Sequence, residues 1–304
     1  MKLTNKYNLP DIIVRAIGEL YPPRRGRVSV TNLIDAPLIR LLKMKYWDQL
    51  EEDVSDHLWG LLGQAAHEII QRGRTHIDRV EQKLEISVYG TTVTGRADLL
   101  QGEEELIDLK VTSVYSFLLG EKEAWKKQLN VYNYMFSREP RPVQIKRAKI
   151  YGILRDWQKA KGFRDRDYPE IPFFIQEVDL WPLEKTQKYV EENVLLHQWA
   201  EEYFDTPPEG LIDPMLLCTD ADRWLRPTTY AVHKKRAKRA LRVFNTVEEA
   251  GAYAIKASKG KGGLVIDERP GEAIRCERFC SVRKVCPLYR KESPNVVQTD
   301  GQAA

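Results

Sequence analysis

Hydrophobic residues change their spacing along the first two thirds of the chain. Over 54–74 they recur every three or four positions, which predicts a helix with one apolar face. They then alternate with polar residues, which predicts strands over 81–89, 91–100 and 105–111. Gly90 and Gly102 mark the turns between these strands. A helix, two strands and a helix are predicted next: 122–137, 145–155, 173–180 and 184–204. This order of elements predicts an α/β fold in which a mixed central sheet is flanked by helices.

Breaks in the pattern divide the chain into four expected regions. Residues 1–28 form an N-terminal helical segment that ends in a proline- and glycine-containing loop. The core covers 29–205, and its first helix follows an N-cap at 29–32, with Pro37 in an early turn or restarting the helix. A smaller C-terminal module covers 206–290, and the polar tail 291–304 is expected to be disordered.

Composition places few limits on function. Of 304 residues, 42% are hydrophobic and 30% charged, as in ordinary soluble proteins. Lysine and arginine exceed aspartate and glutamate by 48 to 44, and a net charge of +4 is too small to identify a nucleic-acid partner. No segment has the roughly 18 apolar residues of a membrane helix, and no signal peptide is recognisable. We therefore expect a cytoplasmic protein with no membrane partner.

Two carboxylates and a lysine lie on neighbouring predicted strands. Asp98 is near the end of one strand, and Asp108 and Lys110 lie in the next. Because side chains alternate along a strand, Asp108 and Lys110 point to the same face. Carboxylates can fix a metal ion beside a phosphodiester, and a lysine can stabilise the charge that develops. A solvent-facing Asp–Lys pair is the better interpretation of D-x-K alone.

Four short motifs favour the chemical interpretation. They are Gly63-x-x-x-His67, Gly95-x-Ala97-Asp98, Asp108-x-Lys110 and Gln128-x-x-x-Tyr132. In this order, and on a helix, two strands and a helix, they resemble the RecB-like branch of the PD-(D/E)XK nucleases. The resemblance spans roughly residues 30–180. Each motif alone is weak, and the ordered set is specific.

The resemblance implies a site and an activity. The metal, Mg²⁺ or Mn²⁺, would be held by His67, Asp98, Asp108 and the backbone carbonyl of Leu109. The catalytic residues would be Asp98, Asp108 and Lys110, with Gln128 and Tyr132 contacting DNA or the lysine. The expected activity is hydrolysis of DNA, as an exonuclease on single strands or duplex ends in recombination, repair or phage DNA processing. The alternative is a non-catalytic DNA-binding or recombination accessory protein that retains the nuclease fold.

The chain also contains four cysteines, which in a reducing compartment are better metal ligands than disulfide partners. Three are clustered and one is distant: Cys276, Cys280, Cys286 and Cys218. Thiolates bind iron–sulfur clusters and zinc in sets of four. RecB-like relatives such as AddB and the CRISPR-associated exonucleases carry a 4Fe–4S cluster on three C-terminal cysteines and one that precedes the nuclease motifs. Here Ala36-Pro37 stands at that earlier place, so Cys218 would supply the fourth ligand, with zinc as the alternative metal.

A basic segment lies between Cys218 and the other cysteines. It holds six positive side chains and no acidic one over 233–242: Lys234, Lys235, Arg236, Lys238, Arg239 and Arg242. These could contact DNA phosphates, and a solvated basic hairpin or helix face is the alternative. The segment from Cys218 onward resembles the C-terminal part of phage-encoded members of the superfamily. No Walker A sequence is present, so a helicase or recombination partner would be a separate protein.

Overall fold

A computed structural model describes residues 1–120, 122–162, 164–205, 213–258 and 263–292. It divides the chain into two compact units, Met1–Leu216 and Leu217–Ala304. The expected N-terminal segment belongs to the first unit. Of the expected tail, residues 291 and 292 end a helix and 293–304 lie outside the described residues. Among the described residues, no helix has the length and apolar character needed to cross a membrane.

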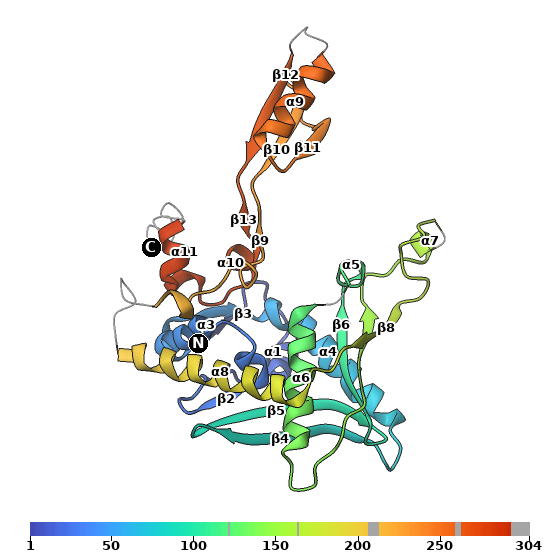
Figure 1. Ribbon diagram of the computed structural model, residues 1–304, viewed down its shortest axis with the longest axis vertical. Coiled ribbons are helices and arrows are strands. Elements are labelled where there is room, and N and C mark those ends of the chain that lie inside the picture. Colours follow the sequence, from blue (N-terminus) through green and yellow to red (C-terminus); the bar gives the residue numbers. More distant parts are fainter. Residues whose placement is uncertain (121, 163, 206–212, 259–262, 293–304) are drawn as a thin grey trace. The chain divides into compact units, whose positions relative to one another are not determined.

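The first unit is built on a six-stranded mixed sheet (Figure 1). Its strands are β2 (Arg27–Ser29), β4 (Arg79–Val88), β5 (Thr91–Gln101), β6 (Glu105–Thr112), β7 (Arg147–Leu154) and β8 (Phe173–Val178). They run in the order β2-β5-β6-β7-β8, and β4 pairs with β5. The β2–β5 and β6–β7 pairs are parallel and the others are antiparallel. Every strand predicted in the core is therefore present, and the mixed sheet is confirmed.

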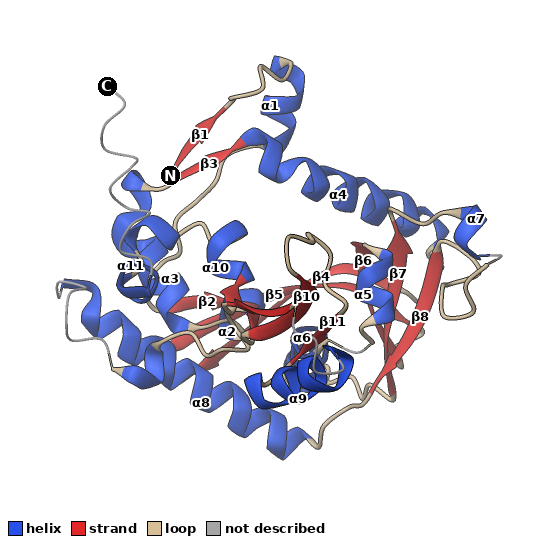
Figure 2. Ribbon diagram, turned by 90° about the horizontal axis from the view of Figure 1, so that it is seen from above, coloured by secondary structure: helices blue, strands red, loops and turns tan. Residues whose placement is uncertain are grey.

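Helices cover both sides of this sheet, with α4 on one side and α6 and α8 on the other (Figure 2). The helices of the unit are α1 (Asp11–Ile17), α2 (Val30–Leu33), α3 (Pro37–Tyr46), α4 (Leu58–Ile70), α5 (Val114–Leu118), α6 (Glu123–Ser137), α7 (Lys159–Gly162) and α8 (Leu183–Glu202). Pro37 restarts the chain's second predicted helix, because a proline fits the first turn of a new helix. A parallel pair, β1 (Lys2–Thr4) with β3 (Glu51–Asp53), completes the unit.

The core lies between the sheet and the α6 side. Leu129, Met135 and Phe136 of α6 are fully buried against strand residues such as Leu106 and Ile150. Helix α4 has the apolar face that its sequence predicts, but none of its residues is buried. Its apolar pattern gives a helix as predicted, but the described elements cover too little of it to enclose its apolar face.

Strands β5 and β6 form a fork. One edge of β5 pairs with β4 along almost its whole length. The other edge pairs with β2 near its start and with β6 near its end. The β5–β6 pairing stops at Leu99 opposite Ile107, so Asp98 and Asp108 are the first residues beyond the last paired position. The fold thus places two carboxylates where the strands separate.

The second unit contains a small sheet with one helix against it. Strand β10 (Thr229–Lys234) lies between β11 (Arg242–Phe244) and β12 (Leu264–Arg269), and α9 (Val247–Ser258) packs on all three. The backbone N–H of Glu249 donates to the Thr246 hydroxyl, as expected for a helix that begins there. A short β9–β13 pair (Leu225–Arg226 with Glu272–Ala273) leads into α10 (Ile274–Arg278) and α11 (Pro287–Glu292).

Candidate active site

Where β5 and β6 separate, the Asp98 side chain replaces a backbone carbonyl of β5 as the hydrogen-bond acceptor. The Leu109 N–H donates to Asp98 Oδ2 at 2.8 Å, a hydrogen bond that a continuing β5 carbonyl would otherwise accept. The Asp98 carboxylate is therefore fixed toward β6, while the neighbouring Leu109 carbonyl points to a different partner. That partner is His67 of α4, whose Nε2 lies 3.2 Å from the Leu109 oxygen.

His67 also meets two carboxylates through its other ring nitrogen. Its Nδ1 lies 3.3 Å from Glu81 Oε1 and 3.7 Å from Asp98 Oδ1. Among the described residues, His67, Glu81 and Asp98 are the one set of three such side chains whose ligand atoms all lie within 4.8 Å of one another. Imidazole with carboxylates is a donor set suited to divalent cations such as Mn²⁺ or Mg²⁺.

Glu81 is a residue that the sequence interpretation missed. It lies directly across the β4–β5 pair from Asp98, between the paired positions Val80–Leu99 and Gln82–Ala97. Its φ of 50° is strained for a glutamate, and strained backbone is common at functional sites. Arg96 lies 2.7 Å from its second oxygen, so the carboxylate is held in place.

Asp108 occupies the other side of the fork. It is almost fully buried, and its Oδ2 lies 2.7 Å from Lys110 Nζ. This oxygen accepts no hydrogen bond from the described residues. A buried carboxylate oxygen in that state is costly unless a cation compensates it. The Lys110 ammonium supplies that compensation. Asp108 is not one of the three clustered ligands, whereas Glu81 is.

The remaining expected residues form a chain of contacts from Lys110 to helix α6. Lys110 Nζ donates to Gln128 Oε1 at 3.2 Å, and Gln128 is hydrogen-bonded to Tyr132 one turn later. Burial raises the pKa of Tyr132 to about 12, so the phenol stays protonated. A Cβ at Gly95 would overlap the Tyr132 ring, which explains the glycine on the neighbouring strand. The structure thus brings Gln128 and Tyr132 to the lysine.

The negative charges of Asp98 and Asp108 repel each other. Burial raises the pKa of Asp98 to about 6, and the nearby charge of Asp108 acts in the same direction. His67 and Lys110 act in the opposite sense. A bound divalent cation would favour the charged form of both carboxylates.

Two more cations, also missed in the sequence, lie near Lys110. Burial lowers the pKa of Lys122, and the charges of Lys110 and Arg155 lower it further. Arg155 lies over the Trp59 ring at 4.5 Å, and Lys122 donates to the Ser116 hydroxyl at 2.8 Å. No local motif marks them, because they reach the site from the helix α6 N-terminus and the end of β7.

The four cysteines of the second unit, all among the described residues, are free thiols, and no three of their sulfur atoms lie within 4.8 Å of one another. Burial raises the pKa of Cys218, and the neighbouring Cys286 and Cys280 raise it further. Burial likewise raises the pKa of Cys280 and Cys286, each with a contribution from Cys276. The charges of Cys280 and Cys286 therefore act on Cys218, although 58 residues separate it from Cys276 (276 − 218) along the chain.

Two arginines lie close to these thiols. Arg275 lowers the pKa of Cys218 and Cys280, and Arg223 lowers that of Cys286, each against the larger effect of burial. Arg223 is itself buried. Positive charge beside buried sulfurs suits thiolate ligands, which are anionic when they bind metal.

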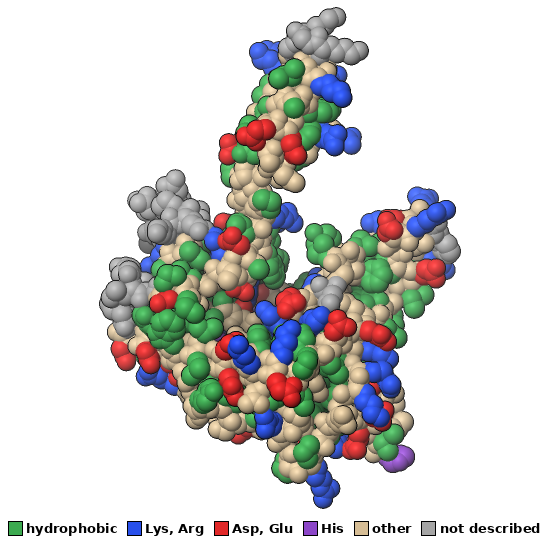
Figure 3. All heavy atoms as spheres, in the orientation of Figure 1, with side chains coloured by type: hydrophobic (Ala, Val, Ile, Leu, Met, Phe, Trp, Pro, Cys, Tyr) green, Lys and Arg blue, Asp and Glu red, His purple; other side chains and the backbone are tan. Residues whose placement is uncertain are grey.

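The basic segment is the turn of a hairpin. It joins β10 to β11, with Leu241 N–H donating to the Val232 carbonyl at 2.8 Å. All six basic side chains are exposed: Lys234, Lys235, Arg236, Lys238, Arg239 and Arg242. Lysine and arginine side chains stand out from this small sheet in the space-filling view (Figure 3). Of the two local structures expected for this segment, a hairpin and a helix face, the hairpin is observed.

Comparisons with known proteins add little. No protein-family model matches the chain, and no curated protein does. One solved structure that it resembles is the crystal structure of SSO0001, with a TM-score of 0.42 and 17% sequence identity. The match covers 61% of this chain and 84% of that one. Similarity at this level carries no argument about activity.

Proposed function

We propose that the chain is a metal-dependent deoxyribonuclease with a RecB-like PD-(D/E)XK core. The observation that carries the proposal is the convergence of His67, Glu81 and Asp98 on one point beside buried Asp108 and Lys110. These groups come from one helix and three strands, and the fork in the sheet brings them together. Burying a charged carboxylate such as Asp108 costs stability even when a lysine is paired with it, so a role in chemistry explains the pair better than a role in folding.

Each side chain has a role that its contacts support. The cation would be held by Glu81, Asp98, Asp108, His67 and the Leu109 carbonyl. Arg96 would orient the Glu81 carboxylate, and the Leu109 N–H would orient that of Asp98. When bound, Mg²⁺ or Mn²⁺ would polarise the scissile phosphate and lower the pKa of a water molecule. Lys110, oriented by Asp108 and Gln128, would place that water or stabilise negative charge on the phosphate.

The second unit would hold a metal group on Cys218, Cys276, Cys280 and Cys286. Burial of the thiols and the adjacent arginines fit an iron–sulfur cluster, which would cross-link the unit. Brown protein with acid-labile sulfide is the expected result. Colourless protein with stoichiometric zinc would replace the cluster with a zinc site. The exposed basic turn at 234–242 would contact DNA phosphates.

Cleavage of labelled DNA tests the activity. Wild-type protein is expected to degrade single strands or duplex ends in Mn²⁺ or Mg²⁺, and to stop on chelation. Asp108→Ala should lose the activity. Metal-dependent degradation that persists in this variant would overturn the site assignment. If the wild type degrades none of the DNA substrates, the result favours the non-catalytic DNA-binding alternative.

A further inference from the structure

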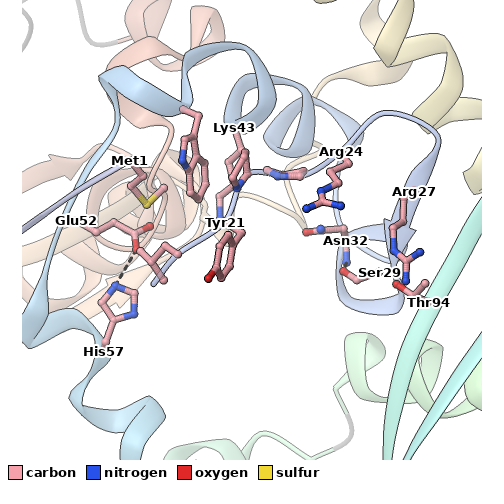
Figure 4. Close-up of a pocket in the computed structure, with 14 residues that line it drawn as sticks. Met1, Tyr21, Arg24, Arg27, Ser29, Asn32, Lys43, Glu52, His57 and Thr94 are labelled. Atoms are coloured by element: carbon pink, nitrogen blue, oxygen red, sulfur yellow. Dashed lines mark hydrogen bonds and ion pairs between the residues drawn. The ribbon is translucent and has the colours of Figure 1, made fainter. Parts of the chain in front are cut away.

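The first unit has a cavity of about 610 Å³ beside the start of strand β5. Among its lining residues are Tyr21, Arg24, Arg27, Lys43, Trp47 and Thr94. Its volume lies within the range of roughly 300–1,000 Å³ that is usual for small-molecule sites. In Figure 4, Tyr21 lies between the Glu52–His57 pair and a group that includes Arg24 and Arg27. The cavity does not include the carboxylates of the candidate active site.

Positive charge dominates this cavity. Arg24 and Lys43 have no carboxylate partner among the described residues, while Arg27 lies 3.1 Å from Glu85. The one acidic residue in the lining is Glu52, and its oxygen is 2.9 Å from His57 Nε2. Two cations that line one cavity without carboxylate partners can bind anions, phosphate groups in particular.

Aromatic surface lies next to these cations. The Tyr21 side chain is 71% exposed, and its hydroxyl donates to Glu19 at 2.8 Å, which anchors one end of the ring. The Trp47 indole is half-buried in the same wall. Cations for the backbone and aromatic rings for the bases are the combination that binds single-stranded nucleic acid. A base paired in a duplex has no free face for such a ring.

The cavity and the candidate active site both contain residues of strand β5. Ser29 of β2 is paired with Thr94 of β5, and both line the cavity. Thr94 precedes Asp98 by four residues, so both side chains point to the same face of β5, about 13 Å apart along the strand. A DNA strand lying along β5 would reach from one to the other within a few nucleotides.

We propose that this cavity binds single-stranded DNA beside the site of cleavage. Arg24 and Lys43 contact phosphates, and Tyr21 and Trp47 stack on an unpaired base. The inference rests on the proposed nuclease function and adds its substrate class, a single strand held on the β2 side of the metal centre. It also gives a reason for the loop 21–24, whose side chains contribute nothing to the buried core.

Binding of a labelled oligo-dT strand tests the proposal, with Ca²⁺ in place of Mn²⁺ to prevent cleavage. The double variant Arg24→Ala/Lys43→Ala should bind more weakly. Its plot of log affinity against log salt concentration should be shallower by about 0.7 for each cation removed. Tyr21→Ala should weaken binding about ten-fold, whereas Tyr21→Phe, which keeps the ring, should restore it.

The matched control is Arg141→Ala/Lys159→Ala, which removes two exposed cations of the same unit outside the cavity. This control should keep wild-type affinity and salt dependence. Thermal unfolding of each variant checks that the fold is retained, as expected because none of the substituted side chains is buried. An Arg24/Lys43 variant with wild-type affinity and slope would overturn the proposal. An equal loss of affinity for a blunt duplex would overturn it too, because the cavity would then not select single strands.

The outcome is separate from that of the nuclease proposal. Binding in Ca²⁺ needs no cleavage, so the cavity can be tested even in a protein that hydrolyses nothing. A wild type without hydrolysis in Mn²⁺ would defeat the proposed function, and loss of strand binding in the cavity variants would still establish the site. A free mononucleotide that competes as well as the strand would overturn the strand as the ligand.

Discussion

The two units of the chain differ in how much of their structure the hydrophobic core can explain. In the first unit, large aliphatic side chains such as Leu100, Leu106 and Ile107 are fully buried between sheet and helices. In the described part of the second unit, the fully buried apolar side chains are small, namely Ala231, Val232 and Ala250, with Val282 at 1% exposure. Burial of apolar area is the main source of stability, so the second unit has much less of it.

This difference separates two uses of metal ligands. In the first unit the strands are already fixed by their hydrogen bonds and core, so the fold would not need the proposed metal site at the fork. In the second unit, Cys286 is one of the few buried side chains, and the other three cysteines are half-buried. On the proposed function, metal ligands would serve catalysis in the first unit and folding in the second.

The largest expected effect is on cleavage, without loss of the fold. Asp108→Asn should lower the cleavage rate about 10³-fold, because it removes a charge that faces the cation. The thermal midpoint of the first unit should stay near that of the wild type, since a buried carboxylate that repels Asp98 is removed. Calorimetry and the cleavage rate check this.

Leu106→Ala, a fully buried core substitution, should instead destabilise the unit by about 2–5 kcal/mol. A similar loss of stability in Asp108→Asn and Leu106→Ala would contradict the distinction between the carboxylates of the fork and the residues of the core.

A cysteine substitution should have the opposite consequence. Cys286→Ser is expected to expose the second unit to protease, while a fragment ending near Leu216 survives. The physical reason is that a small core would lose the cross-link that the proposed metal group provides. Ser281→Ala, five residues away, is the control and should leave the digestion pattern unchanged. If the wild type and Cys286→Ser resist the protease equally well, the thiols do not stabilise this unit.

The third effect concerns Mn²⁺ affinity. Glu81→Gln should weaken Mn²⁺ binding at least about ten-fold, because it neutralises one of the three clustered ligands. Titration calorimetry measures the affinity directly. Glu139→Gln, which loses only the ion pair with Arg79, should bind as the wild type does. Unchanged affinity in the Glu81 variant would remove this residue from the metal centre.

The smallest effect is expected at the basic turn of the second unit. Lys234→Ala/Lys235→Ala should weaken duplex binding a few-fold and flatten the salt dependence by about 0.9 for each phosphate that the variant no longer neutralises. These lysines are exposed, so the fold should not change. Fluorescence anisotropy over a range of salt concentrations gives the slope. An unaltered slope would mean that this turn does not touch DNA phosphates.

Much of the first unit follows from its sequence. The alternating segments become β4, β5 and β6, and the helical segment with Gln128 becomes α6. Glu81 could have been found too. The two-residue turn at Tyr89 and Gly90, both at positive φ, fixes the register and places Glu81 opposite Asp98. Counting back from the turn gives that pairing without a structure.

Other features depend on contacts that no local pattern contains. The apolar spacing of α4 predicts the helix, but whether its face is buried depends on which elements cover it. The sequence likewise supplies Cys218 as a fourth thiol by counting alone. Its electrostatic contact with Cys280 and Cys286 depends on the β9–β13 pair, which brings residues 225–226 beside residues 272–273.

The most direct test of the proposed active site compares two lysines of the same sheet. Lys110 lies 2.7 Å from Asp108, and Lys149 lies 2.8 Å from Glu105, with similar exposure. The rate of Mn²⁺-dependent cleavage of a labelled single strand is measured for Lys110→Ala, Lys149→Ala and the wild type. We predict a loss of about 10²–10³-fold for Lys110→Ala alone, with Lys149→Ala close to the wild type. Equal rates in all three proteins would contradict the proposed active site.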